Sequence, residues 1–282
     1  MKIKLYQCFH DLGATPKEKY LSEIRPALLC GTDVPHRHHE DVDYPIPYLK
    51  DNTGDNISAE NLQYSELTGF YWVWKNEDVD VVGLEHYRRH FIKPNRKIDD
   101  FVHTDDLLDE KDITHALENA DFIIPVPEQL ANTSVFDLYR ICFGDQADDI
   151  VQWMKSYFIK NGMENYLTAM YDYMSHNILY RANMFITTKK EFDEYCSVMF
   201  DMIDYMKAHM VVKPESRVWG YVTENFLAIY VTANKKIARE VDMAVDDFNQ
   251  DIQKDVVYTT YNKERMPFDK DASEQIKYFK SL

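Results

Sequence analysis

The sequence predicts an α/β protein in which a mainly parallel sheet is flanked by helices. Short apolar runs at residues 79–84 and 121–125 have the composition of strands that are buried on both faces, as in parallel sheets. Segments with helical periodicity follow these runs, and strands that alternate with helices favour parallel pairing with right-handed crossovers. With 282 residues, 45% of them hydrophobic, the chain can bury one large core.

Each expected element follows from its own pattern. Strands are expected at residues 3–9, 79–84, 121–125 and 183–187, where β-forming residues cluster. Helices are expected at residues 58–76, 104–119, 147–160, 164–175, 189–210 and 217–233. In the first helix, Ser58 is the expected N-cap, and the buried stripe consists of Leu67, Phe70, Tyr71 and Trp74. A second face of that helix is more polar and carries Asn61, Ser65, Thr68 and Trp72.

The domain organisation is expected to be simple. Residues 31–54 contain three prolines and no periodicity, so they are expected to form a long loop. Residues 1–240 are expected to form one domain. Residues 241–282 are polar and charged, and they are expected to form a peripheral helical or extended tail.

Charge and cysteine usage exclude several classes of partner and location. The 32 basic and 48 acidic residues give a net charge of −16, which argues against nucleic acid and against broad adhesion to anionic lipid. A local basic cluster could still hold one diphosphate. The four cysteines form no CxxC motif and no zinc-like spacing with histidine. The chain lacks a signal peptide and an apolar run of 18 residues, so a cytoplasmic protein is expected.

The densest polar cluster follows the apolar run at 79–84. His86, Tyr87, Arg88 and Arg89 come directly after this predicted strand. In open α/β sheets the ligand crevice lies outside the carboxyl ends of strands. Arginine grips phosphate oxygens with a planar fork, and histidine adds a hydrogen bond or a proton. The pattern therefore indicates an anion site, and the alternative is a strand end whose charges pair with neighbouring carboxylates.

A second polar cluster precedes the first predicted helix. Residues 51–58 contain Gly54 and Asn56, and Asn61 and Glu66 follow within two turns. A glycine-containing loop that opens a helix presents free N–H groups to an anion. The alternative is a plain turn with an N-cap.

Glu224 is the candidate general base. It lies in the predicted helix 217–233 beside the apolar residues Val222, Phe226 and Ile229, which predicts partial burial. A carboxylate whose pKa is raised by burial can accept a proton near neutral pH. The alternative is a surface or helix-capping glutamate.

Two further patterns carry less weight. His36, His38 and His39 could bind a metal, but they lack a partner cluster and are expected to be surface residues. Asp78 and Asp80 have the form of the metal-binding DxD motif of sugar transferases. They precede their strand, however, whereas a working DxD follows one.

Several blocks of the sequence resemble one family. The blocks are residues 51–58, Asn61, residues 64–68, 71–76 and 83–89, and, later, 183–186, 192–196 and 217–224. Together they are similar to the capsular and exopolysaccharide biosynthesis glycosyltransferases that were long catalogued as a domain of unknown function. The resemblance covers residues 1 to about 235. It implies a GT-A-like, Rossmann-type nucleotide-sugar fold.

The resemblance implies a UDP-sugar donor, a galactosyl or galactofuranosyl group for transfer, and a glycan acceptor. The acceptor is expected to be lipid-linked, and peripheral membrane or protein-complex association is compatible with that expectation. It assigns Glu224 and His86 to catalysis and Glu66 and Asn183 to the acceptor or sugar. The donor diphosphate is assigned to Asn56, Asn61, Glu85, Tyr87, Arg88, Arg89 and Arg217. Residues 85–89 stand where a typical GT-A enzyme has its DxD motif, so the basic residues are expected to replace a carboxylate-bound metal. Glu85 is a potential ligand, so binding of Mn²⁺ or Mg²⁺ remains an alternative.

Two rival functions remain open at this point. A phosphate-handling transferase or hydrolase would use His86 with the two arginines and would need no acceptor sugar. A non-catalytic nucleotide- or glycan-binding subunit of a polysaccharide assembly complex would bind UDP without turnover. Donor, acceptor, linkage and oligomeric state are not specified by the sequence.

Overall fold

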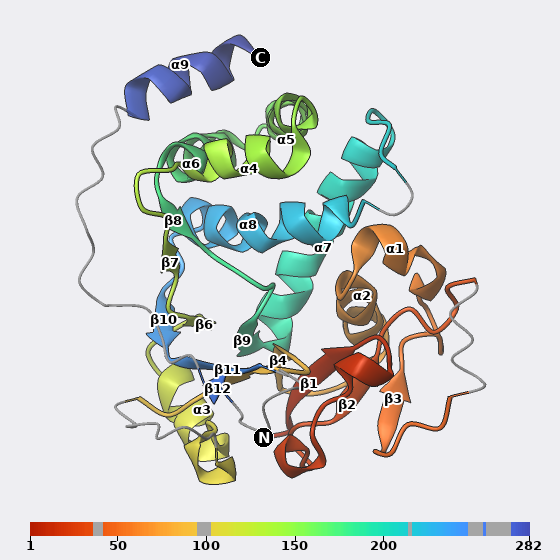
Figure 1. Cartoon of the computed structure of the whole chain (residues 1–282). Coiled ribbons are helices and arrows are strands. Elements are labelled where there is room, and N and C mark those ends of the chain that lie inside the picture. The colour runs from red at the N-terminus through yellow and green to blue at the C-terminus, as the bar shows by residue number, and fades with distance from the viewer. Residues whose placement is uncertain (36–41, 95–102, 214–215, 248–255, 258–271) are drawn as a thin grey trace.

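A mixed, mainly parallel sheet forms the centre of the computed structural model, which describes residues 1–35, 42–94, 103–213, 216–247, 256–257 and 272–282 (Figure 1). Its main path has the strand order β10-β6-β9-β4-β1-β2-β3. The strands of this path are β1 (Ile3–Phe9), β2 (Ala27–Leu29), β3 (Tyr48–Lys50), β4 (Val81–His86), β6 (Phe122–Pro125), β9 (Phe185–Thr188) and β10 (Ala238–Val241). The predicted α/β class is confirmed, and β3 lies inside the region that was expected to be only a loop.

Strand β9 differs in direction from its neighbours. It runs antiparallel to both β4 and β6, whereas β3, β2, β1 and β4 are mutually parallel and β6 is parallel to β10. Leu84, near the end of β4, pairs with Phe185 at the start of β9. The segment that leads into β9 therefore lies at the sheet edge where β1 and β4 end. This edge carries the candidate site.

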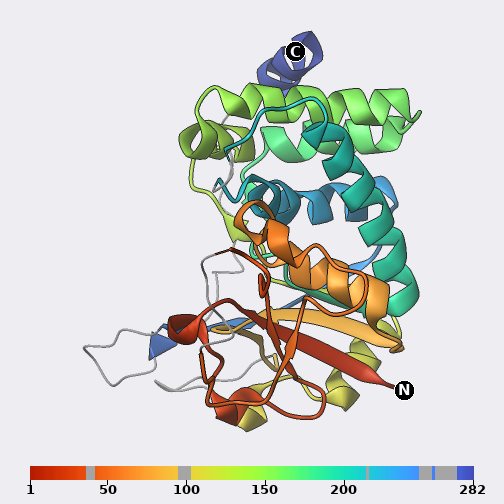
Figure 2. The ribbon, with the colours of Figure 1, turned by 90° about the vertical axis from the view of Figure 1, so that its right-hand side faces the viewer.

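Helices lie mainly on one face of the sheet (Figures 1 and 2). Helices α2 (Leu67–Asn76), α7 (Lys189–Lys207) and α8 (Val218–Ala233) lie nearest the sheet, and α4 (Val135–Phe143), α5 (Gln146–Lys160) and α6 (Glu164–Ser175) form a layer beyond α8. Helix α3 (Glu110–Leu117) lies on the opposite face. The predicted helices at 147–160, 164–175, 189–210 and 217–233 are confirmed; the one at 104–119 is a 3₁₀ turn (Thr104–Asp106) followed by α3, and α4 was not predicted.

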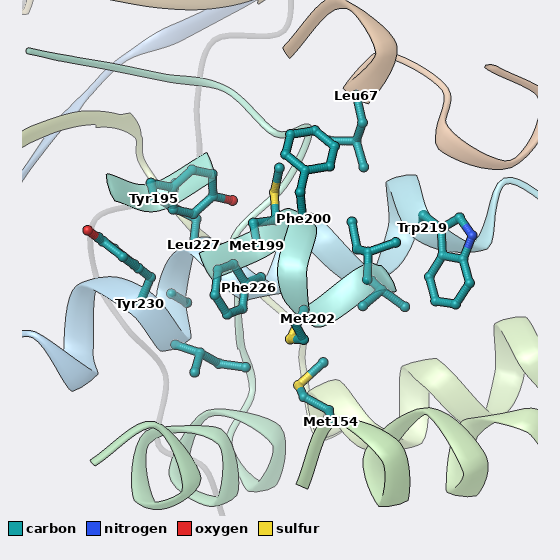
Figure 3. Packing of buried hydrophobic residues seen from close by; sticks show 14 of the residues in the cluster. Leu67, Met154, Tyr195, Met199, Phe200, Met202, Trp219, Phe226, Leu227 and Tyr230 are labelled. Atoms are coloured by element: carbon teal, nitrogen blue, oxygen red, sulfur yellow. The ribbon is translucent and has the colours of Figure 1, made fainter. Parts of the chain in front are cut away.

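Alternation along the strands separates the two largest clusters of the core. Tyr6, Val82 and Phe185 pack with the helices, while Leu5, Val81 and Ile186 face α3. In the larger cluster, aromatic and methionine side chains of α7 interdigitate with those of α8, as Figure 3 shows. Helix α8 is almost completely buried because it lies between the sheet and α6. A polar side chain in the N-terminal half of α8 is therefore fixed in position by the surrounding packing.

The predicted helix 58–76 is interrupted, and Ser58 is not its N-cap. The segment consists of a 3₁₀ turn (Ser58–Glu60), α1 (Asn61–Tyr64) and α2, and the break lies at Ser65, which adopts a positive φ of 52°. The Ser58 hydroxyl instead donates to Asp51 Oδ1 at 2.5 Å. The second, more polar face is buried: Asn61 Nδ2 donates to Ser65 O at 2.5 Å and to Thr68 Oγ1 at 2.9 Å.

Among the described residues after β10, those of β11 (Met243–Asp247) and of α9 (Ala272–Ser281) contact the rest of the fold. Strand β11 pairs with β5 (Arg89–Phe91) and with β12 (Val256–Val257). Helix α9 places Phe279 in the core against Phe136 of α4, at a ring distance of 4.8 Å. Two short strands, β7 (Glu128–Gln129) and β8 (Ile178–Leu179), pair separately. No helix in the described ranges is both long and apolar enough to cross a bilayer.

Candidate functional site

A cleft of about 460 Å³ lies at the edge of the sheet where β1 and β4 end. Cys8, Phe9 and His10 line it from the end of β1, and His86 lines it from the end of β4. The remaining wall comes from the α1–α2 region, from the segment before β9 and from the start of α8. This is the position at which open α/β sheets bind ligands.

Four arginines line the cleft. Arg88 lies in the turn between β4 and β5, Arg89 begins β5, Arg181 precedes β9, and Arg217 precedes α8. The Nε of Arg88 is buried and has no hydrogen-bond partner among the described residues. Burial and the neighbouring Arg88 lower the pKa of Arg89 below its usual range. An anion in the cleft would relieve both features, because it accepts from Arg88 and offsets the repulsion between the guanidinium groups.

Two carboxylates, Glu66 and Glu224, face these cations across the cleft. Burial and the nearby charge of Glu66 raise the pKa of Glu224 to about 7, although a backbone bond from Ala182 and the charges of Arg89 and Arg181 act against the rise. A carboxylate with this pKa is divided between its protonated and ionised forms near neutral pH. It therefore suits proton transfer.

His86 is held as a hydrogen-bonding residue at the floor of the cleft. Its Nε2 lies 2.5 Å from the backbone oxygen of Ala182. Burial is the main cause that lowers the pKa of His86; the charges of Arg89 and Arg217 lower it as well, while the charge of Glu66 and the bond to Ala182 O act against the fall. The ring is therefore neutral at pH 7 and donates from Nε2 to that carbonyl.

Asn183 connects Glu66 to α8. Its Nδ2 donates to Glu66 Oε1 at 2.6 Å and to Gly220 O at 3.0 Å, while its buried Oδ1 has no partner in the described part of the chain. Asn183 and Ala182 both have positive φ angles, of 46° and 73°, and so do Ser65 and Arg217 at the same cleft, each at 52°. Residues held in this region are strained, and such strain clusters at functional sites.

A family model described as "Domain of unknown function (DUF4422)" matches residues 4–235. The chain belongs to the DUF4422 family. No curated protein matches this DUF4422 chain in sequence.

A solved structure shares the fold of this DUF4422 chain. It is the apo structure of WbbM, a bifunctional glycosyltransferase, with a TM-score of 0.70 and 24% sequence identity. The match covers 95% of the present chain and 48% of WbbM, so the chain spans about half the length of that protein. The α/β fold with a mixed, mainly parallel sheet is thus one that a glycosyltransferase also has.

Most site residues expected from the sequence of this DUF4422 chain meet at the cleft. Those lining it are Asn61, Glu66, His86, Tyr87, Arg88, Arg89, Arg217 and Glu224. Asn183 lies directly behind Glu66. Asn56 and Glu85 are not among the lining residues.

The side chains of Asn56 and Glu85 have other partners. Asn56 donates to Gly54 O at 3.1 Å and accepts from Ser58 N at 3.2 Å, so it shapes the turn, as the alternative interpretation has it. Glu85 is 1% exposed and points to the opposite side of the sheet, because neighbouring residues of a strand face opposite ways. The expectation that it faces the diphosphate is therefore wrong, and the physical reason is strand alternation.

Arg181 and Tyr221 line the cleft but were not expected from the sequence. Arg181 forms an ion pair with Glu128 of β7, and it reaches the site only because β9 is antiparallel. Tyr221 lies one helical turn before Glu224 on α8, so the i, i+3 spacing was an available signal.

Asp78 and Asp80, which have the form of a metal-binding DxD motif, are not among the residues that line the cleft. Asp80 lies before β4, at the end remote from the cleft, and its Oδ2 accepts from the Lys2 backbone N at 2.6 Å. His36, His38 and His39 lie outside the described residues. Within the described ranges, no group of three or more His, Cys, Asp or Glu residues could hold a metal ion.

Proposed function

We propose that this protein transfers a hexosyl group from a UDP-sugar to a glycan acceptor in the synthesis of a bacterial capsule or exopolysaccharide. One observation carries the proposal: a cleft at the carboxyl edge of the sheet combines four arginines with a carboxylate, Glu224, whose pKa is about 7. Transfer from a nucleotide sugar needs both features. Cations stabilise the leaving diphosphate, and a base activates the acceptor hydroxyl.

The charges of the cleft match those that develop in the reaction. As the bond between the anomeric carbon and the diphosphate oxygen breaks, negative charge grows on the UDP phosphates. Arg88 and Arg89 lie where they can donate to it, and Arg181 and Arg217 add positive charge from the other walls. Pre-aimed cations are most effective against charge that appears in the transition state.

Glu224 takes the proton of the attacking hydroxyl in this proposal. The hydroxyl oxygen bonds to the anomeric carbon, the sugar–diphosphate bond breaks with inversion, and the proton passes to the ionised Glu224. His86, fixed on Ala182 O, is neutral and shapes the floor beneath the sugar. Glu66 is suited to sugar hydroxyl groups, and Asn183, whose Nδ2 donates to Glu66 Oε1, orients that carboxylate from behind.

The sequence resemblance adds three parts to the proposal. The donor carries a galactosyl or galactofuranosyl group, the acceptor is lipid-linked, and the protein docks at the inner face of a membrane. The arginines take the place of a carboxylate-bound metal. In support, the candidate metal residue Glu85 is buried on the far side of the sheet.

Binding of UDP tests the site before any acceptor is known. Calorimetric titration is expected to show one bound UDP per chain and at least tenfold weaker binding of uridine, because only UDP engages the arginines. Equal binding of the two would contradict a diphosphate site. Release of inorganic phosphate from p-nitrophenyl phosphate without any sugar would instead support the phosphate-handling rival.

The pH dependence follows from the pKa of Glu224. The base works only when ionised, so kcat/KM is expected to rise as the pH increases through about 7, where Glu224 loses its proton. Glu66→Gln removes a negative charge that raises this pKa, so the acidic limb is expected to move to lower pH. The pH profiles of the two proteins provide the measurement. A limb that stays in place would show that Glu66 does not act on the base.

A further inference from the structure

The turn that carries the basic residues has two faces. On the front, His86 and Arg89 pair in register and both line the cleft. On the back, the side chains of Glu85 and His90 are buried, with exposures of 1% and 0%. The direction in which the cleft-facing side chains point therefore depends on the contacts of the buried side chains on the opposite face.

The backbone ladder between β4 and β5 is short. His86 and Arg89 form the one paired position in the register of these two strands. A single pair fixes the direction of a strand weakly, since each ladder position adds only one or two hydrogen bonds. On its other edge β5 pairs with β11 at three positions, but this pairing does not tie β5 to β4. Side-chain contacts behind the sheet add to the single β4–β5 pair.

The carboxylate of Glu85 supplies such contacts. Its Oε1 accepts from the backbone N–H of Phe91 in β5 at 3.0 Å. Its Oε2 lies 3.4 Å from His90 Nδ1 and 3.4 Å from Arg25 Nε. Arg25 is itself anchored, because its guanidinium donates to Leu108 O at 2.6 Å.

The group is closed to water and linked to β1. Gln7 Nε2 donates to Tyr20 O at 3.2 Å and lies 3.4 Å from Glu85 Oε2, and the ring of Tyr20 lies against that of His90 at 4.4 Å. Burial raises the pKa of Glu85, but Arg25, His90 and the Phe91 N–H outweigh burial, so that the pKa lies below its usual value and the group is ionised at neutral pH. Breaking a buried ion pair is costly, so the arrangement is rigid.

We infer that Glu85 is a positioning residue for the diphosphate site: its buried carboxylate clamps β5 against β4 and thereby aims Arg88 and Arg89 into the cleft. The inference rests on the proposed function. It assigns to Glu85 a role behind the sheet, in place of direct contact with the donor.

The test compares UDP binding by two buried-glutamate variants. Glu85→Gln keeps the shape of the side chain but removes the charge that holds Arg25 and His90, and we expect UDP affinity to fall at least tenfold. Glu191→Gln is the matched control. Glu191 lies on α7, which follows the end of β9 that is remote from the cleft, and it is 9% exposed. Its carboxylate accepts from Tyr230 Oη at 2.8 Å and from Lys236 Nζ at 2.6 Å. We expect the control to lose stability with less than a twofold change in UDP affinity.

A second variant covers the case in which Glu85→Gln does not fold. Arg25→Met with Glu85→Met removes both charges, and such paired replacements are often close to neutral for stability. We expect this variant to melt near the wild-type temperature, to bind UDP at least tenfold more weakly, and to show a shallower dependence of affinity on salt, because the arginines no longer converge on the phosphates.

The outcomes separate this inference from the proposed function. Affinity within twofold of wild type in either folded Glu85 variant would overturn the positioning role. Failure of the wild-type protein to bind UDP would instead overturn the proposed function.

Discussion

Glu224→Gln is expected to lower turnover by about 10²–10⁴, the usual contribution of a general base. The amide fills the same space but accepts no proton from the acceptor hydroxyl. UDP affinity is expected to stay the same or to increase, because the variant removes a negative charge that faces Arg89 and Arg181. Steady-state kinetics and UDP titration on one preparation separate the two effects.

The control for Glu224→Gln is Glu194→Gln. Glu194 is exposed on α7 and its nearest cation, Lys190, is 3.9 Å away. The control is expected to keep wild-type turnover. A Glu224→Gln variant with turnover as high as that of the control would remove Glu224 from the mechanism.

Arg89→Met is expected to weaken UDP binding by about 10- to 100-fold, because a hydrogen bond to a charged group contributes about 1.5–3 kcal/mol. Arg89 stands between the basic turn and the carboxylates: Arg88 lowers its pKa, and Glu224 and Glu66 act in the opposite direction. Methionine keeps the apolar stem and removes the guanidinium. The change is therefore expected in phosphate binding, measured by UDP titration.

Arg89→Met is also expected to raise the pKa of Glu224, whereas Glu66→Gln lowers it. Arg89 lowers the pKa of Glu224, so its removal is expected to move the acidic limb of the pH profile to higher pH. Arg239→Met, on the exposed face of β10, is the control and is expected to leave both quantities unchanged. Unaltered UDP affinity in Arg89→Met would place the diphosphate elsewhere.

The sequence predicted the basic turn because its residues are local. An apolar strand followed by His86, Tyr87, Arg88 and Arg89 is a continuous pattern, and the structure places all four residues at the cleft. The same period of two implies that Glu85 faces away from His86, and applying it would have moved Glu85 out of the site. Helix α4 was also within reach, since Ser134 and Asp137 form a capping box at its start.

The remaining features depend on long-range pairing. Strand β9 has four residues, Phe185 to Thr188, and their pattern carries no signal of direction. Its antiparallel course, and with it the place of Arg181 and Asn183, could therefore not be predicted. Strand β11 lies in a polar segment, and only its pairing with β5 shows that residues after 240 support the basic turn. Burial, the main cause of the raised pKa of Glu224, was expected from its apolar neighbours, but the added effect of Glu66, which lies far from it in sequence, was not.

The central claim is tested most directly by measuring the release of UDP from a panel of UDP-sugars, which includes mutase-generated UDP-galactofuranose. Wild type and Glu224→Gln are compared, each with and without EDTA. The account predicts that wild type releases UDP from one donor in preference to the others, at least 100-fold faster than the variant, and that EDTA leaves this rate intact. Equal and measurable rates for the two proteins would contradict the role of Glu224. No release from any donor by either protein, together with normal UDP binding, would contradict the account and favour a non-catalytic nucleotide-binding subunit.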